Sequence, residues 1–388
     1  MRSSKRGMAI FGRSGILSGI VAGIAVIAVG GFAAAALAEA NGNLKISTSA
    51  GAYQLSQKNA FFDPFNKKTG TSIDVETNNN PIEKLKSWKT ASKAGMDVVN
   101  LTSHQAEVAC REGLLRLLNS SDIETGPNVK DLSKDFLGDS LMDCAVPSVA
   151  WSSLMVVKHD AFKKKKPRTW RDFFNTKSYP GKRSMRQSAR YTMEIALMSR
   201  RVKAQDVYSS LSTINGQKKA FQALDKLRDD IVWWDKSPQS IKNLMTDEVV
   251  MGVAYNGRLF DAIVKQSLDV TLIWQGQIYD FDYWGIPVKS GNQVEALEFV
   301  KFATAPEQLA QQSRWMPYGP MRKSSIDFVG NHELIDVHMS AYLPTTKAHF
   351  QRALKFNEGW WLSEDGQKLE ERFKAWLDGK LEWPEKSD

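Results

Sequence analysis

Apolar and polar residues alternate along the chain with two periodicities, one typical of strands and one typical of helices. Residues 44–48 alternate singly and predict a strand, whereas residues 54–68 place apolar side chains on one helical face. Thr69-Gly70 predicts the end of that helix, because glycine favours the position after a helix. Further strands are predicted at 72–76, 96–101, 249–255 and 283–287, and further helices at 82–91, 189–200, 295–302 and 367–377. This order predicts an α/β fold with mostly parallel sheets flanked by helices.

The length of the chain and its lack of linkers indicate two lobes joined by the fold itself. The 388 residues suffice for two domains, each with its own core. Residues 146–157 form a long apolar stretch that predicts a buried or crossing strand, and no long Pro/Gly linker, internal repeat or low-complexity segment occurs. We therefore expect a hinge of crossing strands and a cleft between the lobes, where small ligands commonly bind.

The first 38 residues have the anatomy of a secretory signal peptide. Four cations precede an apolar run at 16–36, which ends in Ala36-Leu37-Ala38, a small-x-small cleavage pattern. The alternative is an uncleaved anchor, because ~18 apolar residues can cross a bilayer. The cleavage point has no cysteine, so we do not expect a lipid-anchored form. Export predicts a periplasmic protein.

Charge gives little reason to expect a nucleic-acid partner. The formal net charge is +9, and removal of residues 1–38 with their four cations lowers it to +5. The lysine run at 163–166 has no interleaved aromatic residues and no recognisable nucleic-acid motif around it. We interpret it as a solvated loop.

Cys110 and Cys144 are the two cysteines of the chain. An oxidising compartment favours a disulfide between them, and the alternative is two buried free thiols. Neither belongs to a CxxC pair, so zinc would lack ligands and no metal site is expected.

The motifs of common enzyme classes are absent from the sequence. None of the five histidines forms an HExxH pair, and no phosphate-binding GxxxxGK[ST] loop, dinucleotide-binding GxGxxG turn or GxSxG nucleophile elbow occurs. We therefore expect neither an enzyme nor a cofactor.

A cluster of acids and aromatic residues at 279–284 predicts a site for a cation. Asp280 and Asp282 are two apart, so in a strand they share a face. Unpaired buried carboxylates are costly, so two of them on an apolar face should meet a cation, to which aromatic faces add roughly 0.5–2 kcal/mol each. The alternatives are local pairing of the acids with Lys or Arg, and ordinary core packing of each aromatic residue.

Several short motifs together resemble the periplasmic spermidine/putrescine-binding proteins of ABC importers. They are Asp97-Val98-Val99 with Thr102-Ser103, Thr169-Trp170, and the segments 179–182, 252–257, 282–287 and 317–320. The resemblance runs from about residue 44 to the C-terminus. It implies a two-lobed type II periplasmic-binding-protein fold, with 43–150 and 276–388 in lobe 1 and 151–275 in lobe 2.

The resemblance also implies a ligand site. The residues that match positions where the family contacts its ligand are Tyr53, Thr102, Ser103, Tyr255, Asp282 and Tyr318. Of these, Asp282 would hold an amine, Tyr255 would form an aromatic wall, and Tyr318 would line the mouth.

The chain also departs from the family pattern. The acids that polyamine binders carry at 187–191 are absent, and Asp280 stands where tryptophan is usual. Arg190 and Arg258 could supply positive charge nearby.

The expected function is therefore that of a monomeric solute-binding protein that delivers a polyamine or another small amine to a membrane permease. The departures leave open a zwitterion such as 4-aminobutyrate, with its amine on an acid and its carboxylate on an arginine. Two further alternatives are an enzyme that reuses this fold and a ferric-ion-binding protein of the same fold.

Overall fold

The computed structural model describes residues 42–77, 80–163 and 165–383. The predicted signal peptide lies outside these residues. Helices and strands alternate as the sequence predicts, and the described residues form one compact unit.

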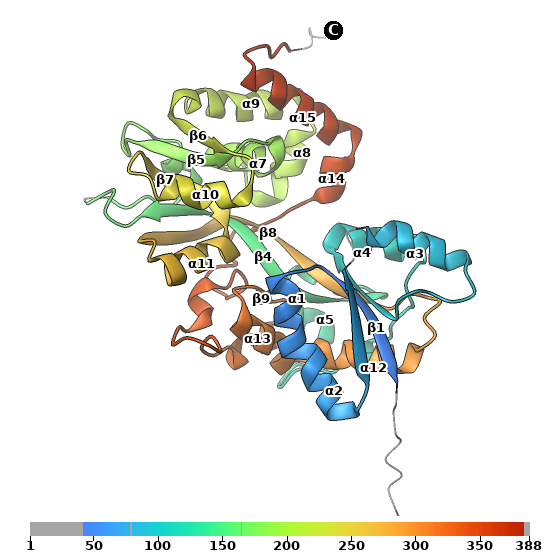
Figure 1. The fold of residues 1–388 in the computed structure, drawn as a ribbon. Helices are drawn as coiled ribbons and strands as arrows, with labels where there is room; N and C mark the ends of the chain where they lie inside the picture. The colour runs from blue at the N-terminus through green and yellow to red at the C-terminus, as the bar shows by residue number, and fades with distance from the viewer. Residues whose placement is uncertain (1–41, 78–79, 164, 384–388) are drawn as a thin grey trace, which may run out of the picture. The chain divides into compact units, whose positions relative to one another are not determined.

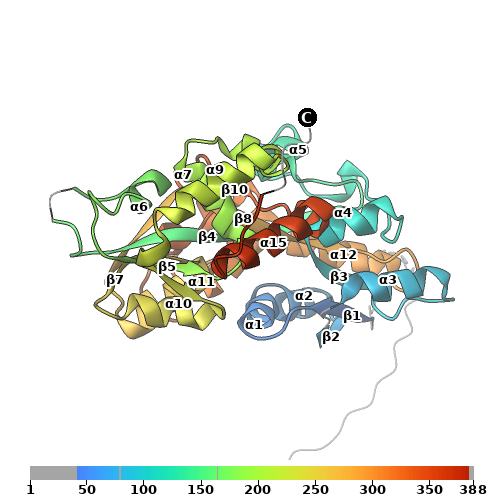
Figure 2. The ribbon, with the colours of Figure 1, turned by 90° about the horizontal axis from the view of Figure 1, so that it is seen from above.

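A single mixed sheet of ten strands organises the chain, in the order β2-β1-β3-β8-β4-β7-β5-β6, with β9 beside β4 and β10 beside β8 (Figures 1 and 2). The strands are β1 (Asn43–Thr48), β2 (Ser72–Thr77), β3 (Val98–Thr102), β4 (Ala145–Lys158), β5 (Lys182–Arg186), β6 (Ile231–Trp234), β7 (Val249–Tyr255), β8 (Val270–Gly285), β9 (Gly319–Pro320) and β10 (Leu354–Lys355). Strands β1, β2 and β3 are parallel, as are β5, β6 and β7. The sheet therefore consists of two parallel ends, which we call the first and second strand groups.

Two long central strands join these groups. β4 has 14 residues and β8 has 16, and they pair antiparallel along most of their length. Their register shifts twice, between Pro147 and Ala150 and between Ser153 and Met155. β3 pairs with one end of β8, and β7 pairs with β4. This is the expected arrangement of crossing strands (Figure 1).

Helices cover the first strand group. They are α1 (Ala52–Gln57), a π-helical turn (Lys58–Phe62), α2 (Asp63–Thr69), α3 (Pro81–Thr90), α4 (Ser103–Arg111), α5 (Leu132–Asp135), α12 (Gln293–Ala303) and α13 (Pro306–Trp315). Trp284 of β8 packs edge-on against Phe61 and Phe299, with ring centroids 6.2 and 5.5 Å away. Gly70 ends α2 in the left-handed conformation at φ 77°, as Thr69-Gly70 predicts.

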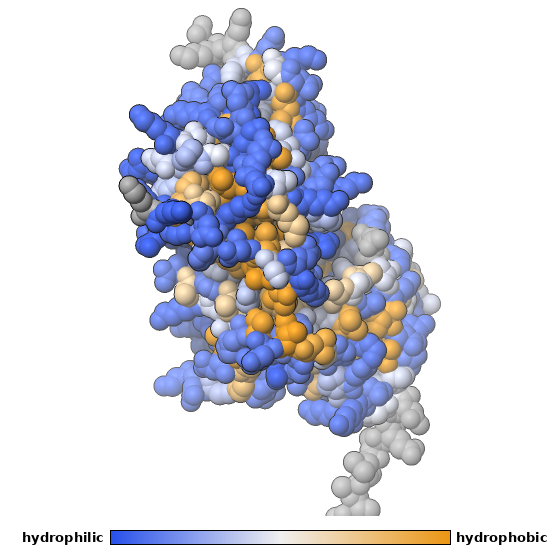
Figure 3. Space-filling view, turned by 60° about the vertical axis from the view of Figure 1, so that its left-hand side comes forward, coloured by the Kyte–Doolittle hydropathy of each residue, from blue (hydrophilic) through white to orange (hydrophobic). Residues whose placement is uncertain are grey.

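The second strand group has its own helices and core. The helices are α6 (Trp170–Phe173), α7 (Ala189–Ser199), α8 (Val207–Leu211), α9 (Ile214–Asp225), α10 (Ser237–Leu244) and α11 (Asn256–Gln266), joined by α14 (Glu358–Leu362) and α15 (Glu364–Leu377). Figure 3 shows that polar residues cover much of one face, with a band of apolar residues through its middle.

The C-terminal helix α15 packs on the second group. Trp376 lies 6.0 Å from Phe221 of α9 and 6.3 Å from Trp233 of β6, and Figures 1 and 2 show α15 beside α9. We expected residues 276–388 in lobe 1, and the packing of α14 and α15 favours lobe 2 for these two helices. The lobe boundaries themselves remain a prediction.

Cys110 at the end of α4 and Cys144 just before β4 are bonded, with their Cα atoms 5.9 Å apart. Among the described residues, no helix is long and apolar enough to cross a membrane, and no group of three or more His, Cys, Asp or Glu side chains could hold a metal ion.

Candidate ligand-binding site

Asp280 on β8 is a buried carboxylate, 3% exposed. Its Oδ1 accepts a hydrogen bond of 2.6 Å from the Ser103 hydroxyl and one of 2.8 Å from the backbone N–H of Phe281. Burial raises the pKa of Asp280 to about 6, although these two donors and the charge of Lys355 oppose the rise. The carboxyl group is therefore held in place at an energetic cost.

Helix α4 positions Ser103. Thr102 caps this helix in a reciprocal capping box with Gln105, which fixes the turn that follows β3. The Thr102 hydroxyl also donates to the carboxylate of Glu358 across 3.3 Å. The two predicted residues therefore have different roles: Ser103 contacts Asp280, whereas Thr102 caps the helix that positions Ser103.

Asp282 lies two residues further along β8, opposite Thr102 in the antiparallel pairing with β3. Burial raises the pKa of Asp282 to about 7, the neighbouring Tyr53 hydroxyl lowers it, and the charge of Asp280 raises it further. Neither Asp280 nor Asp282 forms an ion pair with any Lys, Arg or His that the structure describes. The alternative of local pairing is therefore wrong for both acids.

Tyr53 and Tyr318 stand beside these acids. Their ring centroids are 5.8 Å apart. Burial and then the charge of Asp282 raise the pKa of Tyr53 well above its ordinary value. Burial raises the pKa of Tyr318 to about 12, with a further rise from Asp282 and an opposing effect from Arg258. Tyr318 is thus under the electrostatic influence of both an acid and an arginine.

Tyr255 brings in residues of the second strand group. It ends β7, and its ring lies 5.7 Å from Trp151, 5.9 Å from Tyr191 and 6.2 Å from Trp234. Asn256, the next residue, donates to the carbonyl of Pro317 and accepts from the backbone N–H of Ser152. Asn256 therefore connects the end of β7 to the segment that carries Tyr318.

Tyr191 is a site residue that the sequence analysis missed. It has the left-handed φ of 70°, which is uncommon for a bulky side chain, and its ring stacks on Phe356 with centroids 4.6 Å apart. Burial raises its pKa well above the ordinary value, and Tyr255 and Asp280 contribute to the rise. Such strained conformations concentrate at functional sites.

Arg186 is the second missed residue. It ends β5, donates to the Tyr255 hydroxyl across 3.3 Å, and lies 5.5 Å from the centroid of the Tyr191 ring. No carboxylate in the described part of the chain forms an ion pair with it. Of the arginines that we expected nearby, Arg190 lies over Trp361, 6.0 Å from the ring centroid, whereas Arg258, exposed on α11, is close enough to Tyr318 for its charge to oppose the rise of that tyrosine's pKa.

These side chains form what we call the acid–aromatic cluster. Its members are Tyr53, Ser103, Arg186, Tyr191, Tyr255, Asp280, Asp282 and Tyr318. A small hollow at one edge of the cluster is lined by Arg186, Tyr191 and Tyr255 but by neither acid, and a hollow of about 800 Å³ in the described chain lies elsewhere. The chemistry of the cluster defines the candidate site: two carboxylates and one guanidinium group, none of them in an ion pair with a described residue, each contact or electrostatically influence its tyrosines.

The chain is similar to known proteins over most of its length. Residues 60–341 match the family of bacterial extracellular solute-binding proteins. The chain belongs to this family. It is also 33% identical to the gamma-aminobutyric acid-binding protein of Pseudomonas aeruginosa, over 89% of this chain and 93% of that one.

Two solved structures are similar to this solute-binding protein. An ABC transporter substrate-binding protein from Bradyrhizobium japonicum USDA 110 is 26% identical, with a TM-score of 0.68 over 87% of this chain and 100% of that one. A protein described as a GABA receptor is 25% identical, with a TM-score of 0.67 over 86% and 97% of the two chains. These structures confirm the predicted two-lobed fold. The comparisons identify an ABC-importer binding protein, and they do not confirm the polyamine group.

Proposed function

We propose that this solute-binding protein captures a small zwitterion with an amine at one end and a carboxylate at the other, such as 4-aminobutyrate (GABA). The observation that carries the proposal is that Asp280, Asp282 and Arg186, none of which forms an ion pair with a described residue, lie among the tyrosines of one cluster: Arg186 contacts Tyr255 and Tyr191, Asp280 influences Tyr191, and Asp282 influences Tyr53 and Tyr318. The P. aeruginosa relative, whose name says that it binds gamma-aminobutyric acid, supports the same ligand class.

In this proposal the acids receive the ammonium group. A cation beside Asp282 supplies the counter-charge that the protein lacks there, and hydrogen bonds between charged partners are about twice as strong as neutral ones. Tyr53 and Tyr318 flank the acid and offer ring faces to the ammonium group and to the methylene groups. The amine end therefore belongs to the first strand group and its helices.

The carboxylate end belongs to Arg186. A guanidinium group matches the two oxygens of a carboxylate in geometry and charge. A diamine would place its second ammonium near this arginine, where like charges repel, and the acids that polyamine binders carry at 187–191 are absent. The site therefore favours the zwitterion over putrescine or spermidine.

Ligand capture would couple to transport through closure of the two lobes. A ligand that contacts Asp282 on β8 and Arg186 on β5 binds better when the two groups approach, so it favours the closed state. We propose that the closed form, in the periplasm, docks on the permease of an ABC importer.

Calorimetry with GABA, putrescine and spermidine tests the proposal. We expect GABA to bind more tightly than either amine, and Arg186→Gln to weaken GABA binding at least tenfold. Arg200→Gln is the matched control, because Arg200 is exposed at the end of α7 and lies outside the cluster. Tighter binding of putrescine than of GABA would restore the polyamine assignment, and equal losses in both variants would remove Arg186 from the site.

A further inference from the structure

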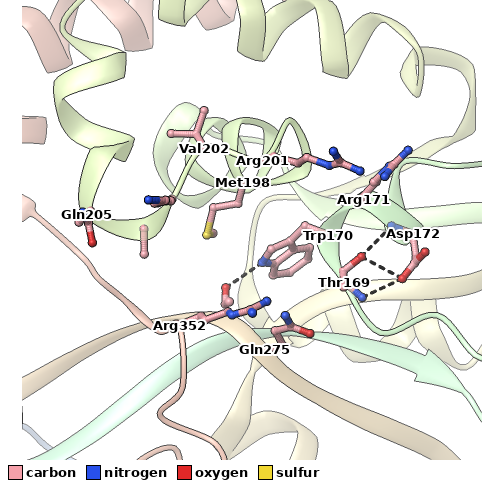
Figure 4. Close-up of a pocket in the computed structure, with 13 residues that line it drawn as sticks. Thr169, Trp170, Arg171, Asp172, Met198, Arg201, Val202, Gln205, Gln275 and Arg352 are labelled. Carbon is pink, nitrogen blue, oxygen red and sulfur yellow. Dashed lines mark hydrogen bonds between the residues drawn. The ribbon is translucent and has the colours of Figure 1, made fainter.

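A hollow on the second strand group shares no lining residue with the acid–aromatic cluster. It has a volume of about 800 Å³ and is lined by residues 169–172, 198 and 201–205, together with Gln275, Gly276 and Arg352 (Figure 4). This volume lies within the range of about 300–1,000 Å³ that is typical of small-molecule sites. We call it the arginine pocket.

Its lining is strongly positive. Arg171, Arg201, Lys203 and Arg352 face a single acid, Asp172. The Asp172 carboxylate is already used at the start of α6, where it accepts hydrogen bonds from Thr169 and from the backbone N–H of Arg168. None of the four cations forms an ion pair within 42–77, 80–163 and 165–383. Their positive charge is therefore left to solvent or to a ligand.

Two of these cations stand at turns of the backbone, and one of them, Arg352, has a side-chain partner. Arg201 and Arg352 have left-handed φ angles of 68° and 58°, which side-chain-bearing residues rarely adopt. When the oxygen and nitrogen of the Gln275 amide are exchanged, both atoms form hydrogen bonds. The amide oxygen accepts from Arg352 across 2.7 Å, and the amide nitrogen donates to the carbonyl of Arg168 across 3.3 Å. The pocket thus has a fixed cation on its β8 side.

Trp170 separates the cations within the pocket. Its ring nitrogen donates to the carbonyl of Gly276 across 2.7 Å, which anchors the indole to β8. Figure 4 shows Arg171 and Arg201 extending toward the same side of the pocket above Trp170, with Arg352 below it. An anion with two charged ends could meet cations on both sides of this ring.

We propose that the arginine pocket is a second ligand site, which binds a small organic dianion such as a dicarboxylate or a phosphate monoester. Both ligand types offer paired oxygens to guanidinium groups and relieve the repulsion among the four cations. A zwitterion such as GABA is disfavoured, because the pocket has four cations and one carboxylate, whose Oδ2 already accepts hydrogen bonds at the start of α6. This site is independent of the proposed GABA site.

Calorimetry of the purified protein with succinate and with glycerol 3-phosphate tests the pocket, at fixed ionic strength because salt screens exposed charges. We expect at least one of the two to bind, and their relative affinities separate a dicarboxylate site from a phosphate site. The double variant Arg171→Gln/Arg201→Gln should weaken that binding at least tenfold. Lys226→Gln/Lys242→Gln removes the same charge from two exposed positions outside the pocket, one just after α9 and one on α10, and should change it less than twofold.

Circular dichroism and the melting temperature check that the double arginine variant is folded. Lys203→Gln is a second test if that variant fails to fold, and it should weaken the dianion at least threefold. Absence of binding by both probes would overturn the proposal, as would equal losses in the arginine and lysine variants, which would show only a general charge effect.

Discussion

In the ligand-free protein, burial makes the ionised forms of Asp280 and Asp282 energetically costly. Burial raises their pKa values to about 6 and about 7, and no described cation pairs with them. A carboxyl group whose pKa lies so near neutrality changes charge in the range where the protein works. Its protonation should therefore compete with binding of an ammonium group.

The affinity for GABA should fall as the pH is lowered from 8 to 6. With a pKa of about 7, Asp282 is mostly ionised at pH 8 and only about one-tenth ionised at pH 6, so the ligand must displace a proton and affinity falls about tenfold. Calorimetry at several pH values measures this directly. A dissociation constant that does not change between pH 6 and 8 would contradict a role for Asp282 in holding the amine.

Asp282→Asn separates this acid from its neighbour. Loss of a charged hydrogen bond should weaken GABA by about 1.5–3 kcal/mol, and the remaining pH dependence should shift toward pH 6, where Asp280 titrates. Asp261→Asn is the control, because Asp261 is paired with Lys265 at the surface of α11. Unchanged affinity in Asp282→Asn would make this residue structural.

Asp282 should make the stability of the ligand-free protein increase as the pH falls, whereas the affinity for GABA should decrease. Its folded-state pKa lies above the ordinary value of 3.8, so the folded state binds the extra proton between about pH 4 and 7. Stability therefore rises as the pH falls through 7. Urea titration measures the free energy of unfolding of the wild type and of Asp282→Asn at each pH. The wild-type value minus the variant value should increase as the pH falls from 7 to 4.

At the scale of single residues, strand alternation was enough to place Asp280 and Asp282 together. Tyr191 and Arg186 were missed for different reasons. Tyr191 was expected inside a regular helix, but Arg190 and Tyr191 have non-helical angles at the start of α7. Arg186 ends β5, where a basic residue looks like ordinary surface until the fold brings Tyr255 beside it.

At the scale of elements, the long strand β8 was only partly predicted. The sequence indicated β4 almost in full, because its apolar run is continuous, whereas it indicated little more than the end of β8. Gly276 and the glutamines on either side interrupt the pattern of β8. Gln277 is nevertheless buried, and its amide donates to the carbonyls of Pro344 and His349. Such distant partners leave no local signal in the sequence.

Gly276 should be hard to replace. It has a φ of 73°, and an added Cβ would lie 2.8 Å from the ring nitrogen of Trp170, whose hydrogen bond it receives. We expect Gly276→Ala to destabilise the protein by about 2–4 kcal/mol in urea unfolding. Gly379→Ala tests the backbone cost alone, because Gly379 has a φ of 72° with nothing within 4 Å, and it should cost about 1 kcal/mol. Equal costs would show that the contact with Trp170 is unimportant.

The short helix α5 is held by a buried ion pair. Asp135 accepts from Arg322 across 2.7 Å, and both side chains are almost fully buried. Removing one partner leaves the other charge buried without a counter-ion, so Asp135→Asn should cost about 3–5 kcal/mol in urea unfolding.

Asp131→Asn is the matched control for α5. Asp131 caps the same helix at the surface, and asparagine caps as well as aspartate does, so this change should cost less than about 1 kcal/mol. A small effect of Asp135→Asn would show that the site relaxes enough to hydrate Arg322.

At the scale of the whole molecule, the alternation of strands and helices predicted the α/β class, and the solved relatives confirm two lobes. The packing of the C-terminal helix was less predictable. The spacing of Leu369, Phe373 and Trp376 shows that α15 has an apolar face, and this face packs on Phe221 and Trp233. Periodicity identifies which face of a helix is buried, but it does not identify the partner.

Ligand binding and lobe closure should occur together, so the free energy of unfolding and the radius of gyration should change at the same GABA concentration. GABA at about 100 times its dissociation constant should raise the free energy of unfolding by about 2.7 kcal/mol, because the ligand binds only the folded state. Small-angle X-ray scattering under the same conditions should show a smaller radius of gyration, since Asp282 and Arg186 lie on strands β8 and β5 and the proposed ligand spans them. Asp282→Asn at the same GABA concentration should show less of both effects. Stabilisation without compaction would mean that the ligand contacts one strand group alone, and Arg186 would then lose its proposed role.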